Sequence, residues 1–411
     1  MRAYERFLRY AAYPTMSDPE SGRHPSTEKQ LALGRELVRE LLELGLSDAE
    51  LDAYGYVYAT LKRNTSVRCN TLALIAHMDT SPDASDENIK CQLMTYEGKD
   101  LCLNPERGIY LRKSDYPSLG EYVGRTLIVS DGTTLIGADD KAGVAEIMTA
   151  LERLVTENIP HGDVKICFTP DEEIGEGADN IDMRRLGADY GYTVDGGALG
   201  ELEYENFNAA SAKVTVHGVS IHPGSAKGKM KNAARIVAEF NSMLPEFEIP
   251  EHTSGYEGFY HLTSVSGGCE SAVASYIIRD HDRAKFEKRK ALFTRVAEAV
   301  NHRYGEGTLT LELTDSYFNM REVIERNMFV FERARHAMLA EGVTPRINPI
   351  RGGTDGARLS FMGLPCPNLS TGGENFHSRF EFVSVEAMDK MTDVLVRIVT
   401  DVVGEICEEI V

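Results

Sequence analysis

The nonapeptide Leu135-Ile136-Gly137-Ala138-Asp139-Asp140-Lys141-Ala142-Gly143 is the stretch on which the interpretation of this chain depends. It places two adjacent carboxylates at the start of a predicted helix, directly after a short apolar run. A helix N-terminus offsets part of their repulsion, so the pair taken alone is best explained as a helix N-cap. A divalent cation would offset it more fully, because Asp139 could offer one oxygen to each of two metal ions. Other parts of the chain decide between the two explanations.

The composition is that of a soluble globular protein with two or three domains. The chain has 411 residues, of which 42% are hydrophobic and 26% are charged. Its net charge of -20 argues against nucleic acid or an anionic membrane as the main partner. The seven scattered cysteines include no Cys-x-x-Cys motif, which argues against a thiolate zinc site and fits a reducing cytoplasm. No signal peptide or membrane-length apolar run is present, so we expect cytoplasmic localisation.

Two helices are expected before the first strand. The first covers residues 2–12 and stops before Pro14. The second covers residues 28–44, with Ser26 and Thr27 as its predicted caps.

Short apolar runs then alternate with helical stretches. The runs span residues 71–76, 164–168 and 190–194 and are continuously apolar, as expected for strands buried on both faces. This alternation predicts an α/β domain with a mostly parallel sheet and helices on both faces. Residues 83–124 fit neither pattern, and we expect an irregular excursion that carries a hairpin.

The pattern changes from about residue 208, where the order of elements becomes that of a ferredoxin-like βαββαβ unit. Its expected strands and helices lie at 211–217, 229–243, 258–264, 273–279, 282–303 and 308–315. We therefore predict an inserted α+β lid domain at 208–319 and a discontinuous catalytic, metal-binding domain at 1–207 and 320–411.

Acidic and histidine side chains follow directly on three of the predicted buried strands. They are His77 with Asp79, Glu172 with Glu173, and Asp195. The carboxyl ends of parallel strands meet at one crevice, where Asp139 and His377 could join these residues. Each residue has an ordinary explanation by itself, but together they would form a costly anionic pocket without a cation. Histidines and carboxylates without thiolates are a ligand set for paired Zn²⁺, Mn²⁺ or Co²⁺.

Five motifs in fixed order carry a resemblance that spans the whole chain. They are His77-Met78-Asp79, Gly137-Ala138-Asp139-Asp140-Lys141, Pro170-Asp171-Glu172-Glu173-Ile174-Gly175, Thr193-Val194-Asp195-Gly196-Gly197 and Thr371-Gly372-Gly373-Glu374-Asn375-Phe376-His377. These motifs resemble those of the dinuclear zinc peptidases, a family that includes aminoacylases and glutamate carboxypeptidases. Together with the chain length, the residues of these motifs are most similar to those of the tripeptide aminopeptidases of that family.

The resemblance implies two zinc ions per subunit, with manganese or cobalt as alternatives. Asp139 would bridge both ions. Glu173 and His377 would complete one site, and His77 and Asp195 would complete the other.

The resemblance also assigns roles to the acids beside the metals. Glu172 would be the general base that moves a proton from water to the leaving amine. Asp79 would hold the imidazole of His77. The peptide bond between Asp139 and Asp140 is expected to be cis.

Three further residues are candidates for substrate binding. His222 fits the histidine that the inserted domain of this family directs to the scissile carbonyl. Arg279 and Arg351 could each bind the C-terminal carboxylate of a peptide. The alternative for all three is ordinary surface charge.

The sequence therefore predicts a metal-dependent aminopeptidase that removes the N-terminal residue from tripeptides. A dipeptidase, carboxypeptidase or N-acyl amino acid hydrolase with the same centre is the alternative within the hydrolases. A catalytically inactive metal- or partner-binding protein is disfavoured by the intact Glu172. A homodimer is compatible with the sequence, which leaves open the native metal, the side-chain preference and whether His222 acts within its own subunit.

Overall fold

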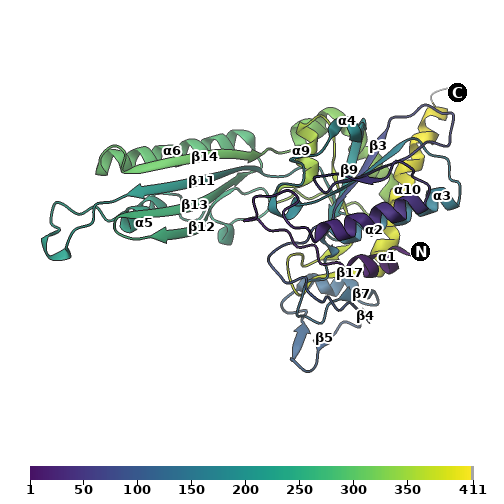
Figure 1. The fold of residues 1–411 in the computed structure, drawn as a ribbon, viewed down its shortest axis with the longest axis horizontal. Helices are drawn as coiled ribbons and strands as arrows, with labels where there is room; N and C mark the ends of the chain where they lie inside the picture. Colours follow the sequence, from purple (N-terminus) through teal and green to yellow (C-terminus); the bar gives the residue numbers. More distant parts are fainter. Residues whose placement is uncertain (409–411) are drawn as a thin grey trace. The chain divides into compact units, whose positions relative to one another are not determined.

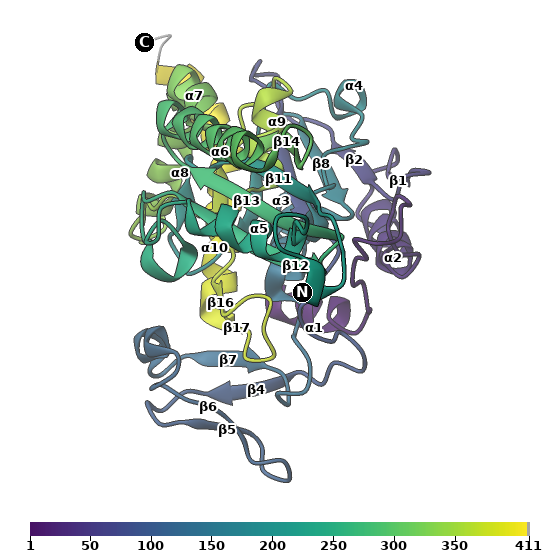
Figure 2. The ribbon, with the colours of Figure 1, turned by 90° about the vertical axis from the view of Figure 1, so that its left-hand side faces the viewer.

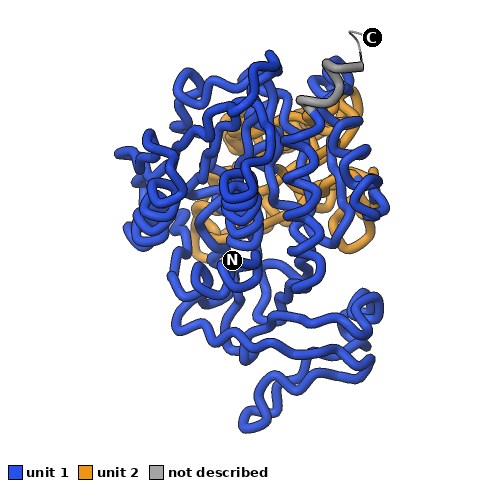
Figure 3. Tube along the Cα trace, turned by 90° about the vertical axis from the view of Figure 1, so that its right-hand side faces the viewer, with its two compact units in different colours: residues 1–204, 322–348, 354–411 blue, residues 205–321, 349–353 orange. Residues whose placement is uncertain are grey.

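The structure is a computed structural model that describes residues 1–408, with its elements labelled in Figure 1. Two compact units divide the chain (Figure 3). Unit 1 consists of residues 1–204, 322–348 and the described residues from 354 onward, and unit 2 consists of residues 205–321 and 349–353. No helix among residues 1–408 is long and apolar enough to cross a membrane.

Unit 1 is built on a seven-stranded sheet with the order β1-β2-β8-β3-β9-β15-β10. The strands are β1 (Glu50–Leu51), β2 (Val57–Leu61), β3 (Leu72–His77), β8 (Val164–Thr169), β9 (Tyr190–Gly196), β10 (Leu202–Glu203) and β15 (Asn368–Ser370). The four central strands, β8, β3, β9 and β15, are parallel to one another. The pairs toward the two edges, β1 with β2, β2 with β8 and β10 with β15, are antiparallel. Every residue of β3 is buried, as its continuous apolar run predicts. The predicted mostly parallel sheet is confirmed.

Helices cover both faces of this sheet. On one face α3 (Ala138–Thr156) packs against β3 and β9, and on the other Leu186 of α4 (Met183–Leu186) and Leu359 of α9 (Asp355–Phe361) join the sheet in one apolar cluster. Two further helices lie near the start of the chain, α1 (Ala3–Tyr10) and α2 (Gln30–Glu43). The others follow the last strand of unit 2 in the sequence and are α7 (Arg321–Ile324), α8 (Met328–Ala340) and α10 (Val385–Glu408). The short 3-10 helices are η1 (Pro117–Tyr122), η2 (Glu172–Ile174), η3 (Pro223–Ser225), η4 (Pro250–His252) and η5 (Glu325–Asn327).

A second sheet of unit 1 has the order β16-β17-β7-β4 (Figure 2). Its strands are β4 (Gln92–Thr95), β7 (Thr126–Val129), β16 (Gly373–Glu374) and β17 (Phe382–Ser384), and the hairpin of β5 (Leu101–Asn104) and β6 (Ile109–Leu111) lies in the same part of the chain. The excursion expected at 83–124 therefore carries the predicted hairpin, but it is more regular than predicted. Its apolar side chains pack with Phe382, a partner far away in the sequence.

Unit 2 contains an antiparallel four-stranded sheet of order β12-β13-β11-β14. Its elements are β11 (Asn208–His217), α5 (Ala233–Ser242), β12 (Phe259–Gly267), β13 (Ser271–Asp280), α6 (Arg283–Tyr304) and β14 (Leu309–Tyr317). The helices cover one face, where Phe240 and Phe293 pack against Tyr276 of the sheet. The predicted ferredoxin-like α+β unit is confirmed.

The predicted caps of the second helix are wrong. Helix α2 begins at Gln30, and the residue at its N-cap position is Lys29, which makes no side-chain cap bond. Ser26 instead donates to the buried carboxylate of Asp171, and the Thr27 hydroxyl donates to the carbonyl oxygen of Met16 at 2.8 Å. Both side chains thus serve tertiary contacts rather than the helix end.

Glu146, in the middle of α3, provides a test of stability against pH. Its side chain is fully buried, and neither carboxylate oxygen has a hydrogen-bond partner among the described residues. Burial raises the pKa of Glu146 well above its usual range, and the charge of Asp389 adds to the shift. The folded state therefore binds more protons than the unfolded chain above the unfolded pKa, so stability falls as pH rises from about 4.3 toward the folded pKa.

We expect Glu146→Gln to remove this dependence, because the amide has the shape of the protonated acid and does not titrate. The variant should be more stable than the parent at pH 7.5, by about 1.4 kcal/mol for each unit by which burial raises the pKa of Glu146, up to pH 7.5. At pH 4 the two should be nearly equal. Urea unfolding at both pH values measures the difference, and a difference independent of pH would contradict the prediction.

Candidate metal centre

The turns after the central strands of unit 1 bring the predicted metal ligands together. Strand β3 ends at His77, β9 contains Asp195, and Glu173 lies in η2 directly after β8. Asp139 lies at the start of α3, and His377 lies in the loop between β16 and β17. The convergence follows from parallel pairing, which places strand ends from distant parts of the chain at one edge.

Asp139 stands between the two histidines. Its Oδ1 lies 2.9 Å from Nε2 of His77, and its Oδ2 lies 3.2 Å from Nε2 of His377. The expected cis peptide between Asp139 and Asp140 is present, and Oδ2 of Asp140 accepts a hydrogen bond of 3.1 Å from the backbone N–H of His77. No side chain caps α3, whose backbone is not helical at either acid. The pair therefore does not act as an N-cap.

Glu173 and Asp195 complete the cluster. Oε2 of Glu173 lies 2.8 Å from Nε2 of His377, and Oδ1 of Asp195 lies 3.3 Å from Nε2 of His77. Potential ligand atoms of His77, Glu172 and Asp195 lie within 4.8 Å of one another, and so do those of His77, Asp139 and Glu173. The five predicted ligands are thus neighbours, while their division between two ions stays a prediction.

The electrostatics of the cluster fit bound cations. Burial raises the pKa of Glu173 to about 8 and that of Asp195 to about 7, and the charge of Asp139 adds to both shifts. Hydrogen bonds to Asp139 and Glu173 raise the pKa of His377 to about 11. The buried Oε1 of Glu173 has no hydrogen-bond partner among the described residues. A set of imidazoles and carboxylates with an unused buried oxygen fits two divalent ions of the Zn²⁺, Mn²⁺ or Co²⁺ type.

Asp79 contacts both the predicted metal ligand His77 and the acidic loop, residues 171–173. Its Oδ1 lies 3.3 Å from Nδ1 of His77, and its carboxylate is fully buried. The same carboxylate accepts hydrogen bonds from the backbone N–H groups of Glu172 at 3.0 Å and Glu173 at 3.2 Å. Asp79 therefore fixes the ring of His77 relative to both glutamates, which is the arrangement expected of a carboxylate behind a metal ligand.

Glu381 is a supporting residue that sequence reasoning missed. Its buried carboxylate accepts hydrogen bonds from the N–H groups of Ile136, Gly137 and Asp139 at 2.8, 2.9 and 3.0 Å. Burial raises the pKa of Glu381 to about 7. It lies between the apolar residues Phe380 and Phe382, outside the motifs, so nothing in the sequence marks it as part of the site.

The predicted substrate-binding residues all belong to unit 2. His222 is exposed, and its Nδ1 accepts a hydrogen bond of 3.1 Å from the N–H of Gly224. Arg351 donates to the carbonyl oxygens of Gly255 at 2.7 Å and Glu257 at 3.0 Å and to the hydroxyl of Thr253 at 3.0 Å. Its guanidinium is therefore occupied by one loop of unit 2.

Arg279 has weaker partners. Its Nη1 lies 3.4 Å from the carbonyl oxygen of Ala210 and 3.3 Å from that of Ile278, and its guanidinium lies 5.3 Å from the ring centre of Tyr317. Burial lowers the pKa of Arg279, and the nearby Tyr317 opposes the shift.

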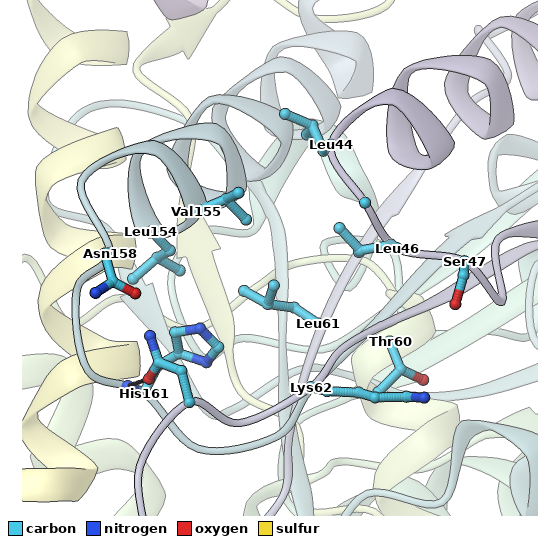
Figure 4. Close-up of a pocket in the computed structure, with 12 residues that line it drawn as sticks. Leu44, Leu46, Ser47, Thr60, Leu61, Lys62, Leu154, Val155, Asn158 and His161 are labelled. Atoms are coloured by element: carbon cyan, nitrogen blue, oxygen red, sulfur yellow. Dashed lines mark hydrogen bonds between the residues drawn. The ribbon is translucent and has the colours of Figure 1, made fainter.

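A pocket of about 280 Å³ lies elsewhere in unit 1, where the ends of α2 and α3 approach β2 (Figure 4). Its lining includes Leu44, Leu61, Leu154 and His161. His161 places its Nδ1 2.7 Å from the carbonyl oxygen of Gly162, so the ring has a structural partner. No predicted site residue lines this pocket, and the candidate site is therefore the cluster of metal ligands.

Comparison with known proteins agrees with this site. A family model described as a peptidase dimerisation domain matches residues 204–308. A protein named peptidase T from Caldanaerobacter subterraneus subsp. tengcongensis is 55% identical over 400 residues, which cover 97% of this chain and 98% of that protein.

Two solved structures share the fold over 98% of both chains. An aminopeptidase from Bacillus cereus ATCC 10987 has a TM-score of 0.77 at 24% identity. A dinuclear metal-binding peptidase of the M20 family from Bacillus subtilis has a TM-score of 0.66 at 15% identity. The family resemblance and the enzyme class predicted from the motifs are confirmed, and the chain belongs to the peptidase T family of M20 metallopeptidases.

Proposed function

We propose that this chain is a tripeptide aminopeptidase in which two divalent ions are held by the five clustered ligands and Glu172 is the general base. The observation that carries the proposal is Asp139, whose two oxygens face His77 and His377 separately. A carboxylate in that position is able to bridge two ions. Zinc is the proposed metal, with manganese or cobalt as alternatives that suit the same donors.

The residues beside the ions perform the proton transfers. Bound ions would supply activation of water and stabilisation of the charge that develops on the carbonyl oxygen. Glu172 accepts a proton from the attacking water and delivers it to the leaving amine. Burial raises the pKa of Glu172 well above its usual range, and the charge of Asp195 adds to the shift. Asp79 fixes the backbone from which Glu172 extends.

The proposal also assigns roles to the two units, an oligomeric state and a cellular compartment. We assign catalysis to unit 1 and a lid or dimerisation role to unit 2, which the match of residues 204–308 to a dimerisation domain supports. A homodimer in the cytoplasm, acting on free tripeptides, is the state that we propose. The pattern of scattered cysteines supports that compartment.

The test is an assay of three substrates with the metal-loaded enzyme. A tripeptide, a dipeptide and an N-acylated tripeptide of the same residues are compared, and elemental analysis measures the metal. We expect turnover of the free tripeptide, because an aminopeptidase requires the free amine. Preferred turnover of the N-acylated tripeptide would favour an N-acyl amino acid hydrolase or a carboxypeptidase, and preferred turnover of the dipeptide would favour a dipeptidase.

Among the residues of unit 2, we predict that Arg279 binds the C-terminal carboxylate of the substrate more strongly than Arg351 does. Arg279 is a half-buried cation whose hydrogen bonds, at 3.3 and 3.4 Å, are long, whereas Arg351 already donates to four acceptors in residues 253–257. Arg279→Ala should raise KM for a tripeptide by about 10-fold or more, the usual effect of losing a charged hydrogen bond, and should abolish the preference over the C-terminal amide.

Arg351→Ala and His222→Ala are the comparison variants. His222→Ala should lower kcat rather than raise KM, because a contact with the scissile carbonyl strengthens as charge develops on its oxygen. An unchanged acid-to-amide preference in Arg279→Ala would show that peptide length is read by another residue.

A further inference from the structure

We propose that Asp171, held by Gln30 and Ser26, is a positioning residue that orients the general base Glu172. Asp171 directly precedes Glu172, and its fully buried side chain bonds to the N-terminal segment. The inference rests on the proposed function, in which Glu172 is the base.

Gln30 makes a reciprocal pair with Asp171. Its Nε2 donates to Oδ1 of Asp171 at 2.6 Å, and its Oε1 accepts a hydrogen bond of 3.2 Å from the backbone N–H of Asp171. Both residues have no exposed surface. One amide group therefore fixes the side chain and the main chain of Asp171 at the same time.

Ser26 binds both oxygens of the same carboxylate, and His24 lies beside it. The N–H of Ser26 donates to Oδ2 of Asp171 at 2.7 Å, the Ser26 hydroxyl donates to Oδ1, and Nδ1 of His24 lies 3.3 Å from Oδ2. Asp171 has a left-handed backbone, with a φ of 59°, which Asp adopts more readily than most residues with a side chain and which contacts with neighbours restrain. These partners supply that restraint.

The backbone of the acidic loop is consequently held from two directions. The N–H of Asp171 is bound by Gln30, while the N–H groups of Glu172 and Glu173 are bound by Asp79. The described residues form no hydrogen bond with the carboxylate of Glu172. The main chain of the loop therefore sets the point from which the Glu172 side chain extends, and a proton transfer within hydrogen-bond reach depends on that position.

The N-terminal segment, residues 13–30, also contacts the two neighbouring loops of the metal centre. The carbonyl oxygen of Tyr13 accepts a hydrogen bond of 2.7 Å from the buried Nζ of Lys141, next to the acid pair. The N–H of Ser17 donates to the carbonyl oxygen of Thr80 at 3.2 Å, next to Asp79. The segment thus binds residues next to the acid pair, next to Asp79 and next to Glu172, and Asp171 is the contact beside the base.

A double substitution that exchanges the amide of Gln30 and the carboxylate of Asp171 tests this hydrogen-bonded pair while keeping both kinds of group. Asp171→Asn places an amide NH₂ against a donor in either orientation, the NH₂ of Gln30 or the N–H of Ser26, and Gln30→Glu places a second carboxylate against that of Asp171. The two changes together restore the bonds, because the new carboxylate at 30 accepts from the new amide at 171 and still accepts from the backbone N–H. Glu40→Gln is the matched control, since Glu40 lies on the same helix and pairs with Arg6 at 3.0 Å, away from Asp171.

Kinetics on a tripeptide, metal content and thermal unfolding are measured for each metal-loaded variant. Each single exchange should lower kcat by about 10- to 100-fold with little change in KM and with full metal, as expected for a misplaced catalytic group. The double variant should recover kcat to within about threefold of the parent, because the effects of substitutions at two contacting residues are not additive. Glu40→Gln should lower Tm and leave kcat unchanged.

Three outcomes would overturn the inference. They are single variants that lower Tm alone, as the control does; a double variant that recovers Tm but not kcat; and a loss of kcat that follows a loss of metal. If the single variants do not fold, Ser26→Ala provides a milder change, which removes one hydroxyl donor to Asp171 and should lower kcat by a smaller factor. A Glu172→Gln variant with normal kcat would instead refute the proposed function itself.

Discussion

The Glu172→Gln variant is expected to bind its metals normally and to lose nearly all turnover. The amide keeps the size of the side chain but cannot accept the proton of the attacking water. General acid–base catalysis contributes roughly 10²–10⁴-fold, and kcat should fall by that factor with KM nearly unchanged. Steady-state kinetics on a tripeptide, with elemental analysis of the same sample, measures the effect.

Glu176→Gln is the control for that experiment. It makes the same chemical change four residues further along the same loop, where the Glu176 side chain is 45% exposed. The control should retain parental kcat. A metal-replete Glu172→Gln enzyme with parental turnover would mean that another residue is the base.

The second large effect is expected on substitution of Asp139, the proposed bridge between the two metal ions. Asp139→Ala should lose both metal ions and all measurable activity, because both of its oxygens face metal-ligating histidines. His77→Ala and His377→Ala should each weaken mainly one ion, since each ring belongs to one side of Asp139. Elemental analysis after dialysis counts the ions, and circular dichroism shows whether the fold remains.

Two full equivalents of metal in folded Asp139→Ala would disprove the bridging role. Equal loss of both ions in the two histidine variants would disprove the division of ligands between the sites. The two results are independent, so the bridge can be tested apart from the ligand assignment.

The parallel core and the ligand cluster could be predicted because they depend on local sequence signals. Buried parallel strands are continuous apolar runs, and their ends meet at one edge, so His77, Asp195 and Glu173 could be placed together from the strand pattern. The antiparallel unit 2 was predictable from the order of its strands and helices along the chain, and β13 alternates buried and partly buried positions.

The remaining features depend on partners that are distant in the sequence. The second sheet of unit 1 joins short strands from residues 92–95 and 373–384, and no local pattern links them. Glu381 acts on backbone N–H groups, which are present at nearly every residue and leave no sequence signal. Ser26 has the residue type of a helix cap but binds Asp171, and only the tertiary structure distinguishes these two uses.

The order of the strands has a consequence for synthesis of the protein on the ribosome. Strand β15 lies between β9 and β10 in the sheet, although it follows them by more than 160 residues in the chain. The growing chain therefore completes β9, β10 and all of unit 2 before β15 is made. Until then the edge of β9 has no partner, and unpaired strand edges in intermediates promote aggregation. Because His377 is made later still, the complete set of proposed metal ligands exists only after residue 377 has been translated.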